Sequence, residues 1–325
     1  MLQQLKLAPL QSFLFQGVRP INRSFNLQPK LMMSTRPRNS EIPSDDCLPS
    51  YEYVFKQDLL KGQVAFITGG GSGIGFRIAE VFMRHGCDTA IASRRLEKCQ
   101  ESAKKLEDAT GQRCLPLSAD VRNPKDVQKT IDKIVDNFGK INILVNSAAG
   151  NFLSDVENLS YNAFKTVIDI DTIGTFNCSK AVYEKYFKKN GGNIINISAT
   201  LHYKGDAMQT HAGSAKAAID AMTRHMAVEW GGNGVRINCI SPGPIDGTVG
   251  MKKLGGESSL REQLENGIPL QRMGQKCEIA DTAVFLVSNA ASYVTGAVLV
   301  VDGGSWMTAF NNFSMIKKFL ANPKL

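Results

Sequence analysis

Residues 64–75 read Val-Ala-Phe-Ile-Thr-Gly-Gly-Gly-Ser-Gly-Ile-Gly, an apolar run that ends in a glycine-rich turn. The stretch Ile74–His85 follows with the periodicity of an amphipathic helix. Glycines let the backbone turn sharply and approach a pyrophosphate, which then sits at the positive end of the helix. The spacing Gly-x-x-x-Gly-x-Gly differs from the commoner Gly-x-Gly-x-x-Gly, but the strand before and the helix after supply the required context. We therefore predict a dinucleotide site that includes Gly69, Gly70, Gly71, Ser72, Gly73 and Ile74.

Outward from this turn, short apolar runs alternate with longer amphipathic stretches over about 240 residues. The expected strands are Val64–Thr68, Thr89–Ser93, Cys114–Ser118, Ile141–Asn146, Asn193–Ile197, Arg236–Ile240 and Val298–Val301. The expected helices are Ile74–His85, Glu97–Thr110, Val127–Phe138, Ala163–Phe187 and Ser214–Trp230. Near-continuous apolar or β-branched runs are typical of parallel strands buried on both faces. The pattern predicts an α/β fold with a single Rossmann-type, doubly wound parallel sheet of about seven strands.

Three segments are expected along the 325 residues: an extension at 1–45, a dinucleotide-binding domain at 46–310 and a tail at 311–325. Hydrophobic residues at 43% and charged residues at 21% indicate a globular protein. No apolar run approaches the ~20 residues of a membrane-spanning helix. The first 40 residues hold six bases and no acid, which leaves 32 bases against 30 acids elsewhere. The folded part therefore has no large basic excess, and nucleic acid is not an expected partner.

The cysteines and histidines indicate neither disulfides nor a metal site. The seven cysteines are scattered and form no Cys-x-x-Cys, which favours reduced thiols. The four histidines lack the spacing of metal ligands, and we expect no metal. His211 and His225 have no evident carboxylate partner and are interpreted as packing or surface residues.

The end of the second expected strand indicates which dinucleotide binds. Sites for NAD commonly place an Asp or Glu there, about 20 residues past the glycines, to bond the ribose hydroxyls. This chain has Ser93-Arg94-Arg95 instead. A guanidinium at this place pairs with a 2′-phosphate, and no carboxylate repels that phosphate. The sequence therefore predicts NADPH, with Ser93 and Arg94 among its ligands.

Further motifs follow the later strands: Asp120-Val121, Asn146-Ser147-Ala148-Ala149-Gly150, Pro242-Gly243-Pro244 and Asp302-Gly303-Gly304. With the glycine-rich turn, they make residues 60–306 resemble the short-chain dehydrogenase/reductase family. The resemblance implies that Asp120 lies near the adenine. It implies that the nicotinamide side is lined by Pro242, Gly243, Pro244, Ile245 and Thr248. It also implies a homo-oligomer, often a tetramer.

The chain departs from that family at the residues that carry the usual chemistry. The family's Tyr-x-x-x-Lys pair appears as Ala212 and Lys216, so the phenol is absent from the helix face where the lysine needs it. The usual serine falls on Ala199, and the usual asparagine of the preceding helix is Asp171. An ordinary alcohol or ketone reductase is therefore not expected.

These departures resemble the 2,4-dienoyl-CoA reductases, and the peroxisomal type in particular. The supporting stretches are 46–49, 150–153, 162–167 and 211–216. The resemblance implies that a fatty acyl-CoA, a 2,4-dienoyl-CoA, is reduced by NADPH to 3-enoyl-CoA in the β-oxidation of unsaturated fatty acids. It implies that Asp171 and Lys216 polarise a proton-donating water held between them, with Lys216 also bonding the nicotinamide ribose. The substrate residues that we expect are Arg94, Arg122, Phe152, Ser160, Tyr161, Asn162 and Lys253.

Two other functions stay open at this point. The first is a carbonyl or 3-oxoacyl-thioester reductase that uses Thr200, Ser214 or Tyr203 as a displaced acid. The second belongs to another class: a catalytically silent NADPH-binding scaffold. Because Asp171 and Lys216 both stand at catalytic positions of the family, we favour the dienoyl-CoA reductase.

The two ends of the chain predict different compartments. The acid-free, Arg-bearing start fits a mitochondrial transit peptide, a disordered extension or an upstream start before Met32 or Met33. The last residues, Pro-Lys-Leu, keep two of the three positions of the Ser-Lys-Leu peroxisomal signal, which makes a peroxisomal import receptor a further partner. We expect a peroxisomal protein, with the mitochondrion as the alternative, because the resemblance of the folded domain is independent of either end.

Overall fold

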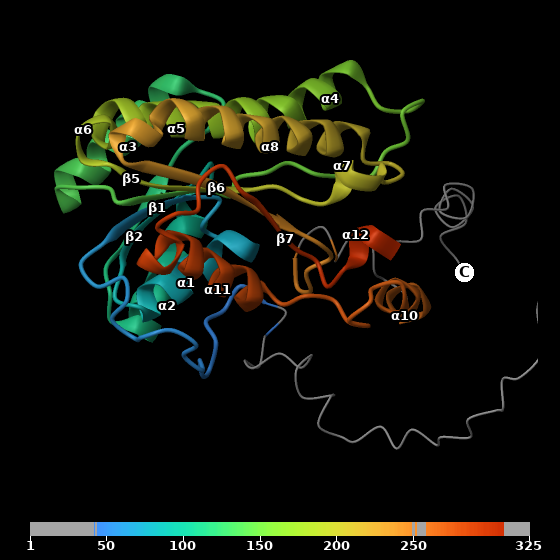
Figure 1. Ribbon diagram of the computed structural model, residues 1–325, viewed down its shortest axis with the longest axis horizontal. Helices are drawn as coiled ribbons and strands as arrows, with labels where there is room; N and C mark the ends of the chain where they lie inside the picture. The colour runs from blue at the N-terminus through green and yellow to red at the C-terminus, as the bar shows by residue number, and fades with distance from the viewer. Residues whose placement is uncertain (1–41, 43, 249–250, 252–257, 309–325) are drawn as a thin grey trace, which may run out of the picture. The chain divides into compact units, whose positions relative to one another are not determined.

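Seven parallel strands form one sheet in the order β3-β2-β1-β4-β5-β6-β7 (Figure 1). The computed structural model describes residues 42, 44–248, 251 and 258–308, so most of the extension and the tail lie outside the described residues. The strands are β1 (Val64–Thr68), β2 (Asp88–Ser93), β3 (Cys114–Ser118), β4 (Ile143–Asn146), β5 (Gly192–Ile197), β6 (Val235–Pro242) and β7 (Val298–Val301). The predicted fold class is confirmed.

The bounds of β4 and β6 differ from the prediction, and hydrogen bonding and strand pairing at these positions account for the differences. The fourth strand begins at Ile143 and not at Ile141, because Asn142 uses its side chain as well as its backbone to meet Val64. The sixth strand runs to Pro242, two residues beyond the predicted end, because Pro242 still pairs with Val301 of β7. A proline fits there because it ends the strand.

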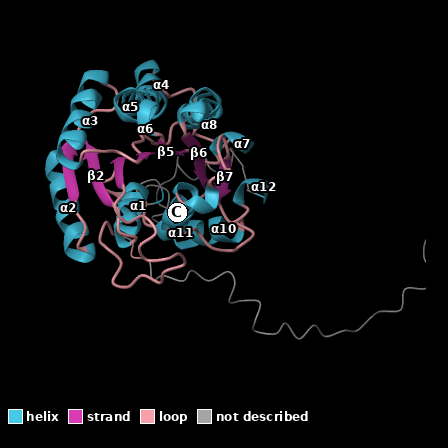
Figure 2. Ribbon diagram, turned by 60° about the vertical axis from the view of Figure 1, so that its left-hand side comes forward, coloured by secondary structure: helices cyan, strands magenta, loops and turns pink. Residues whose placement is uncertain are grey.

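Helices cover both faces of the sheet, and each face has its own apolar core. The helices α1 (Gly73–Arg84), α2 (Leu96–Thr110) and α11 (Lys276–Val287) pack on one face around Phe76 and Ile279. The helices α3 (Pro124–Phe138), α5 (Gly174–Val182) and α8 (Thr210–Trp230) pack on the other. Figure 2 shows α3, α5 and α8 on one side of the strands and α1 and α11 on the opposite side. The shorter helices are α4 (Tyr161–Ile168), α6 (Lys188–Asn190), α7 (Leu201–Lys204), α10 (Ser258–Asn266) and α12 (Ser305–Thr308).

The helix predicted over Ala163–Phe187 is present, but two π-helical turns interrupt its α-helical geometry. The chain there forms α4, a π-helical turn at Asp169–Ile173, then α5 and a second π-helical turn at Tyr183–Phe187. A π turn adds one residue to the helical turn and thereby changes which side chains face inward. Asp171, in the first π turn, is 1% exposed. Gly174 follows it and packs so closely on Val121 that a Cβ atom would lie 2.5 Å from that side chain.

A short segment before the sheet, Ser44–Leu48, which we call the N-terminal strap, is bonded to three helices. The Asp45 carboxylate accepts a hydrogen bond from the Gly73 amide of α1 at 2.8 Å. Lys105 of α2 bonds Asp46 at 2.7 Å, and Lys276 of α11 donates to the Ser44 carbonyl at 2.9 Å. Ser44 and Asp45 belong to the segment assigned to the extension, so contacts with the domain begin at least two residues before position 46.

The strap ends on a buried group of charges in α1. The Glu80 carboxylate accepts from the Leu48 amide at 2.8 Å and pairs with both Arg77 and Arg84. The Arg77 and Glu80 side chains are both 0% exposed. Such a group is stable only while every charge keeps its partner.

No helix among the described residues is long and apolar enough to cross a membrane.

Substitution of Glu80 by alanine is expected to destabilise the fold strongly, because it takes the carboxylate away from two guanidinium groups in a dry environment. We expect the free energy of unfolding to fall by about 3–5 kcal/mol, measured by urea denaturation. The matched control is Glu184→Ala, which breaks an ion pair with Lys180 whose side chains are 51% and 52% exposed. That control should be indistinguishable from the wild type, since exposed pairs contribute little. Equal effects of the two substitutions would contradict this account of the buried charges.

Candidate active site

The glycine-rich turn lies where the strand order reverses, between β1 and β4. Thr68 ends β1 opposite Asn146, which ends β4. The Thr68 hydroxyl accepts hydrogen bonds from the Ser147 and Ala148 amides at 3.1 Å each, which joins the two strand ends. Ligands of open α/β sheets bind at the carboxyl ends of the strands at such a reversal. The predicted dinucleotide residues therefore lie at the edge of the sheet where a ligand is expected.

The turn is closed so tightly that only glycine fits at two positions. Gly69 has a φ of +67°, and a Cβ atom there would lie 2.8 Å from the Ser147 carbonyl oxygen. A Cβ atom on Gly75 would lie 2.7 Å from the carbonyl oxygen of Gly69. At Gly73, by contrast, no atom lies within 4 Å of where a Cβ would be. The absence of side chains at this helix N-terminus fits a pyrophosphate, although the Gly73 amide already donates to the Asp45 carboxylate at 2.8 Å.

The side chains predicted as ligands around the end of β2 differ in their exposure and in their hydrogen bonds. The Arg94 side chain is exposed, and Ser93 bonds locally to Arg95. Arg122 makes three hydrogen bonds to Asp120, at 2.9, 3.1 and 2.5 Å, and this guanidinium lowers the pKa of the Asp120 carboxyl. The sequence assigned Asp120 to the cofactor and Arg122 to the substrate, and the structure pairs them with each other.

Asp171 and Lys216 meet in the interior although 45 positions separate them. The Lys216 Nζ atom lies 3.0 Å from Asp171 Oδ2 and also donates to the Ile197 carbonyl oxygen at 3.0 Å. The other carboxylate oxygen of Asp171 accepts from the Gly150 amide at 2.7 Å. The Lys216 side chain is 9% exposed, and the Asp171 side chain is 1% exposed. The charged atoms are in direct contact, which leaves no room between them for the water that the sequence analysis placed there.

The residues proposed as displaced acids lie in three different environments. The Tyr203 hydroxyl donates to Asp220 Oδ2 at 3.2 Å, and burial raises the pKa of this tyrosine to about 12. Thr200 is buried, and Ser214 is exposed on α8. Ala212, at the place of the family's tyrosine, is 1% exposed. This geometry does not support a carbonyl reductase with a displaced acid.

The sequence reasoning missed the contacts of two histidines. His202 bonds Asp220 Oδ2 at 2.9 Å, so this imidazole and Tyr203 share one carboxylate. His211, interpreted as packing, is fully buried and stacks on Phe152 with ring centroids 4.3 Å apart. The partners of the histidines lie too far along the chain to be read from spacing.

The other predicted residues are spread over several elements: Pro242 and its successors follow β6, and Ser160 and Tyr161 lie at the start of α4. Pro242 ends β6, the Gly243 amide donates to the Val301 carbonyl, and the Thr248 hydroxyl donates to the Ile245 carbonyl at 2.8 Å. Ser160 caps α4 by accepting from the Ala163 amide at 3.1 Å. Tyr161 is 97% exposed. Lys253 lies outside the described residues. Among the residues that the structure does describe, no group of His, Cys, Asp and Glu is arranged to hold a metal ion.

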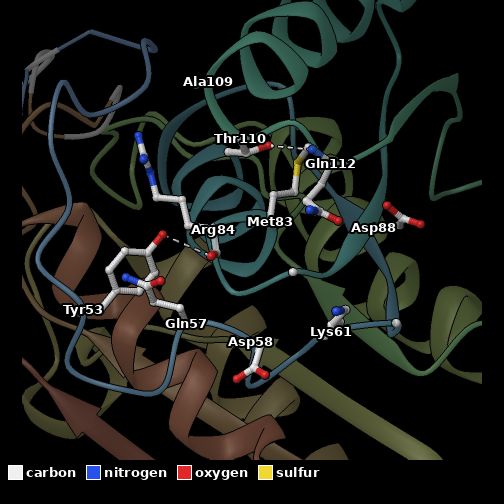
Figure 3. A pocket seen from close by; sticks show the side chains of 12 residues that line it. Tyr53, Gln57, Asp58, Lys61, Met83, Arg84, Asp88, Ala109, Thr110 and Gln112 are labelled. Atoms are coloured by element: carbon white, nitrogen blue, oxygen red, sulfur yellow. Dashed lines mark hydrogen bonds between the residues drawn. The ribbon is translucent and has the colours of Figure 1, made fainter.

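A cavity of about 490 Å³ lies at the other end of the strands (Figure 3). Its lining includes Tyr53, Lys61, Arg84, Asp88 and Thr110. Asp88 begins β2, so this cavity is at the amino end of the sheet. Since ligands of parallel α/β sheets bind at the carboxyl ends, we do not assign the chemistry to it.

Comparison with known proteins gives the same class of protein as the fold and the site. Residues 69–305 match the family model described as enoyl-(acyl carrier protein) reductase. A peroxisomal 2,4-dienoyl-CoA reductase [(3E)-enoyl-CoA-producing] from Danio rerio is 58% identical over 84% of this chain and 91% of its own length. The enzyme of that name from Mus musculus is 56% identical over 86% of this chain and 96% of its own. A short chain dehydrogenase structure from Bacillus anthracis has a TM-score of 0.70 and 39% identity, covering 77% of this chain and 99% of that one.

The fold and the glycine-rich turn therefore define a nicotinamide-dependent oxidoreductase of the short-chain dehydrogenase/reductase class. Within this class, the chain belongs to the family of the 2,4-dienoyl-CoA reductases. The family resemblance predicted from the sequence is confirmed.

Alanine at position 75 is expected to destabilise the protein, although alanine is a better helix former than glycine. Its methyl group would overlap the Gly69 carbonyl, and such overpacking typically costs about 1–3 kcal/mol. Gly71→Ala is the control, because its methyl group would meet nothing closer than the Cys99 sulfur at 3.6 Å. Chemical denaturation of both variants should show a lower midpoint for Gly75→Ala alone. A Gly71→Ala variant that is equally destabilised would argue against this close contact.

Proposed function

We propose that this chain is a peroxisomal, NADPH-dependent enzyme that reduces 2,4-dienoyl-CoA to 3-enoyl-CoA in the β-oxidation of unsaturated fatty acids. Relatives that are 56–58% identical over 84–86% of this chain are named as peroxisomal 2,4-dienoyl-CoA reductases that produce (3E)-enoyl-CoA. The observation at the site that carries the proposal is the buried Lys216–Asp171 pair at 3.0 Å. It lies beside Ala212, where a carbonyl reductase of this class has a tyrosine.

The reaction needs donors for a developing negative charge and a source of one proton. When bound, NADPH supplies the hydride that reduces the far end of the diene. The charge that the substrate acquires spreads onto the thioester oxygen, which hydrogen-bond donors stabilise. A proton then goes to C2. Because the atoms that gain hydrogen are carbons, a phenol aimed at a carbonyl oxygen is not required, and a water polarised by Lys216 and Asp171 supplies the proton.

The choice of NADPH over NADH follows from the end of β2. Arg94 is exposed there and carries a guanidinium that suits a 2′-phosphate. Gly69 to Ile74 would hold the pyrophosphate, and Lys216 would bond the nicotinamide ribose.

The assembly that we propose is a homo-oligomer. Apolar side chains are exposed on helices that cover the same side of the sheet: Ile173 is 42% exposed, Phe176 43% and Val228 85%. Exposed apolar groups of this size are typical of protein interfaces. The Pro-Lys-Leu end, which supports an import receptor as a further partner, lies outside the described residues.

Asp171→Asn is expected to lower kcat by about 10²–10⁴, because it removes the charge that polarises the water while the amide oxygen still accepts from Gly150. NADPH affinity should stay within about twofold of the wild type, since the cofactor cradle is unchanged. Turnover is measured by the loss of NADPH absorbance with a 2,4-dienoyl-CoA. Lys216→Ala should lose turnover and also weaken NADPH binding.

The matched control is Asp169→Asn, two residues away in the same π turn, where the carboxylate pairs with the exposed Lys165. This control should keep wild-type kcat. If the wild type oxidises no NADPH with the dienoyl-CoA, the proposed reaction is wrong. If it does but Asp171→Asn keeps full kcat, the reaction stands and the role of Asp171 falls.

Arg94→Ala should reduce the preference for NADPH over NADH by about 10–100-fold, the worth of one or two charge-assisted hydrogen bonds. The measurement is the ratio of kcat/KM values for the two cofactors. Arg95→Ala, on the adjacent exposed residue, serves as the control and should change that ratio less. A ratio unaffected by Arg94→Ala would remove this residue from cofactor selection.

A further inference from the structure

The loop that follows β4, Gly150–Ser154, is attached to the body of the enzyme from two sides. Its first residue donates from the Gly150 amide to Asp171 Oδ1 at 2.7 Å. Its middle residue accepts at the Phe152 carbonyl oxygen from His211 Nε2 at 3.0 Å. Its last residue donates from the Ser154 amide to the Met208 carbonyl at 3.2 Å. One contact belongs to the catalytic pair, and the other two come from α8 and the residues just before it.

The contact with Phe152 determines which nitrogen of His211 carries the proton. A carbonyl oxygen only accepts hydrogen bonds, so Nε2 must be the N–H and Nδ1 of the neutral ring is bare. The ring is 0% exposed, and its burial lowers the pKa of His211, which keeps the imidazole neutral. The facing charge is Asp171, which acts in the opposite direction. Nδ1 is buried without a hydrogen-bond partner among the described residues.

The same imidazole also supports the Phe152 ring. The two rings are stacked, with centroids 4.3 Å apart and planes inclined by 22°. His211 therefore holds both the backbone and the side chain of one residue. It stands in the first turn of α8, directly before Ala212 and five positions before Lys216. A shift of His211 would move Phe152 relative to the pair that polarises the water.

We propose that His211 is a positioning residue for the reduction, which fixes Phe152 and the Gly150–Ser154 loop against the Lys216–Asp171 pair. This inference rests on the proposed function, because the loop borders the pair that handles the proton. Phe152, in this loop, is one of the residues expected to contact the acyl-CoA substrate, whereas NADPH is expected at the glycine-rich turn, on another element. Loss of His211 therefore affects the use of substrate and leaves NADPH affinity unchanged.

Two substitutions separate the hydrogen bond from the ring contact. His211→Phe keeps an aromatic ring on Phe152 and removes the donor. His211→Gln places an amide N–H near the position of Nε2 and so restores the donor. His225→Gln is the matched control, because His225 is exposed on the same helix. Each variant is measured for kcat, for KM with a 2,4-dienoyl-CoA, for NADPH affinity by fluorescence and for thermal stability.

We expect His211→Phe to lower kcat/KM by about 10-fold through a higher KM, the size expected for one hydrogen bond, with NADPH affinity within twofold. His211→Gln should recover at least half of that loss on a logarithmic scale, and His225→Gln should match the wild type. A His211→Phe enzyme with wild-type kcat/KM overturns the inference. The inference is also overturned if His211→Gln does not recover the lost kcat/KM. The same holds if NADPH affinity and thermal stability fall by as much as kcat/KM does. A wild type that does not turn over the dienoyl-CoA overturns the proposed function itself, which distinguishes that failure from the failure of this inference.

Discussion

The ammonium group of Lys216 imposes the constraint on which the rest of the site depends. A charge that is nearly excluded from water is stable only if it is paired and hydrogen-bonded. Lys216 meets this need with the Asp171 carboxylate and the Ile197 carbonyl, so α8, the π turn and the end of β5 must converge on one point. The other carboxylate oxygen of Asp171 accepts a hydrogen bond from the Gly150 amide, which attaches the loop after β4 to the same point. Four separate parts of the chain are thus positioned by one desolvated charge.

Most of the fold could be predicted because its signal is local. Buried parallel strands such as β1 appear in the sequence as continuous apolar runs. Three of the seven strands have the predicted bounds. The π turn at Asp169–Ile173 could not be predicted in this way. Its residues fit the helical pattern on either side, whereas the features found with the turn are the close packing of Gly174 on Val121 and the inward position of Asp171. Those contacts are tertiary and leave no periodic trace.

Residues of the site could be predicted only where a sequence motif determines both the residue type and its position in the fold. The glycines, Asp171 and Lys216 stand at such positions, and the structure brings the last two into contact. Arg122 shows a limit of this reasoning, because the sequence did not indicate that its side chain pairs with Asp120, two residues away. His211 shows the other limit: its partner Phe152 is 59 positions distant, and spacing alone does not reveal such a contact. Pairing between distant residues is set by topology, which a sequence pattern carries only indirectly.

The strand order has a consequence for how the chain acquires its shape during synthesis. The strands β1, β2 and β3 are neighbours both in sequence and in the sheet, so residues 64–118 can pair as they leave the ribosome. The inner side of β1 is then an unpaired edge until β4, ending at Asn146, arrives to cover it. A nascent chain of that length exposes an apolar strand edge at its centre, which is a template for wrong pairing. The reversal that creates the binding crevice in the finished enzyme is thus also the point at which the growing chain is most exposed to aggregation.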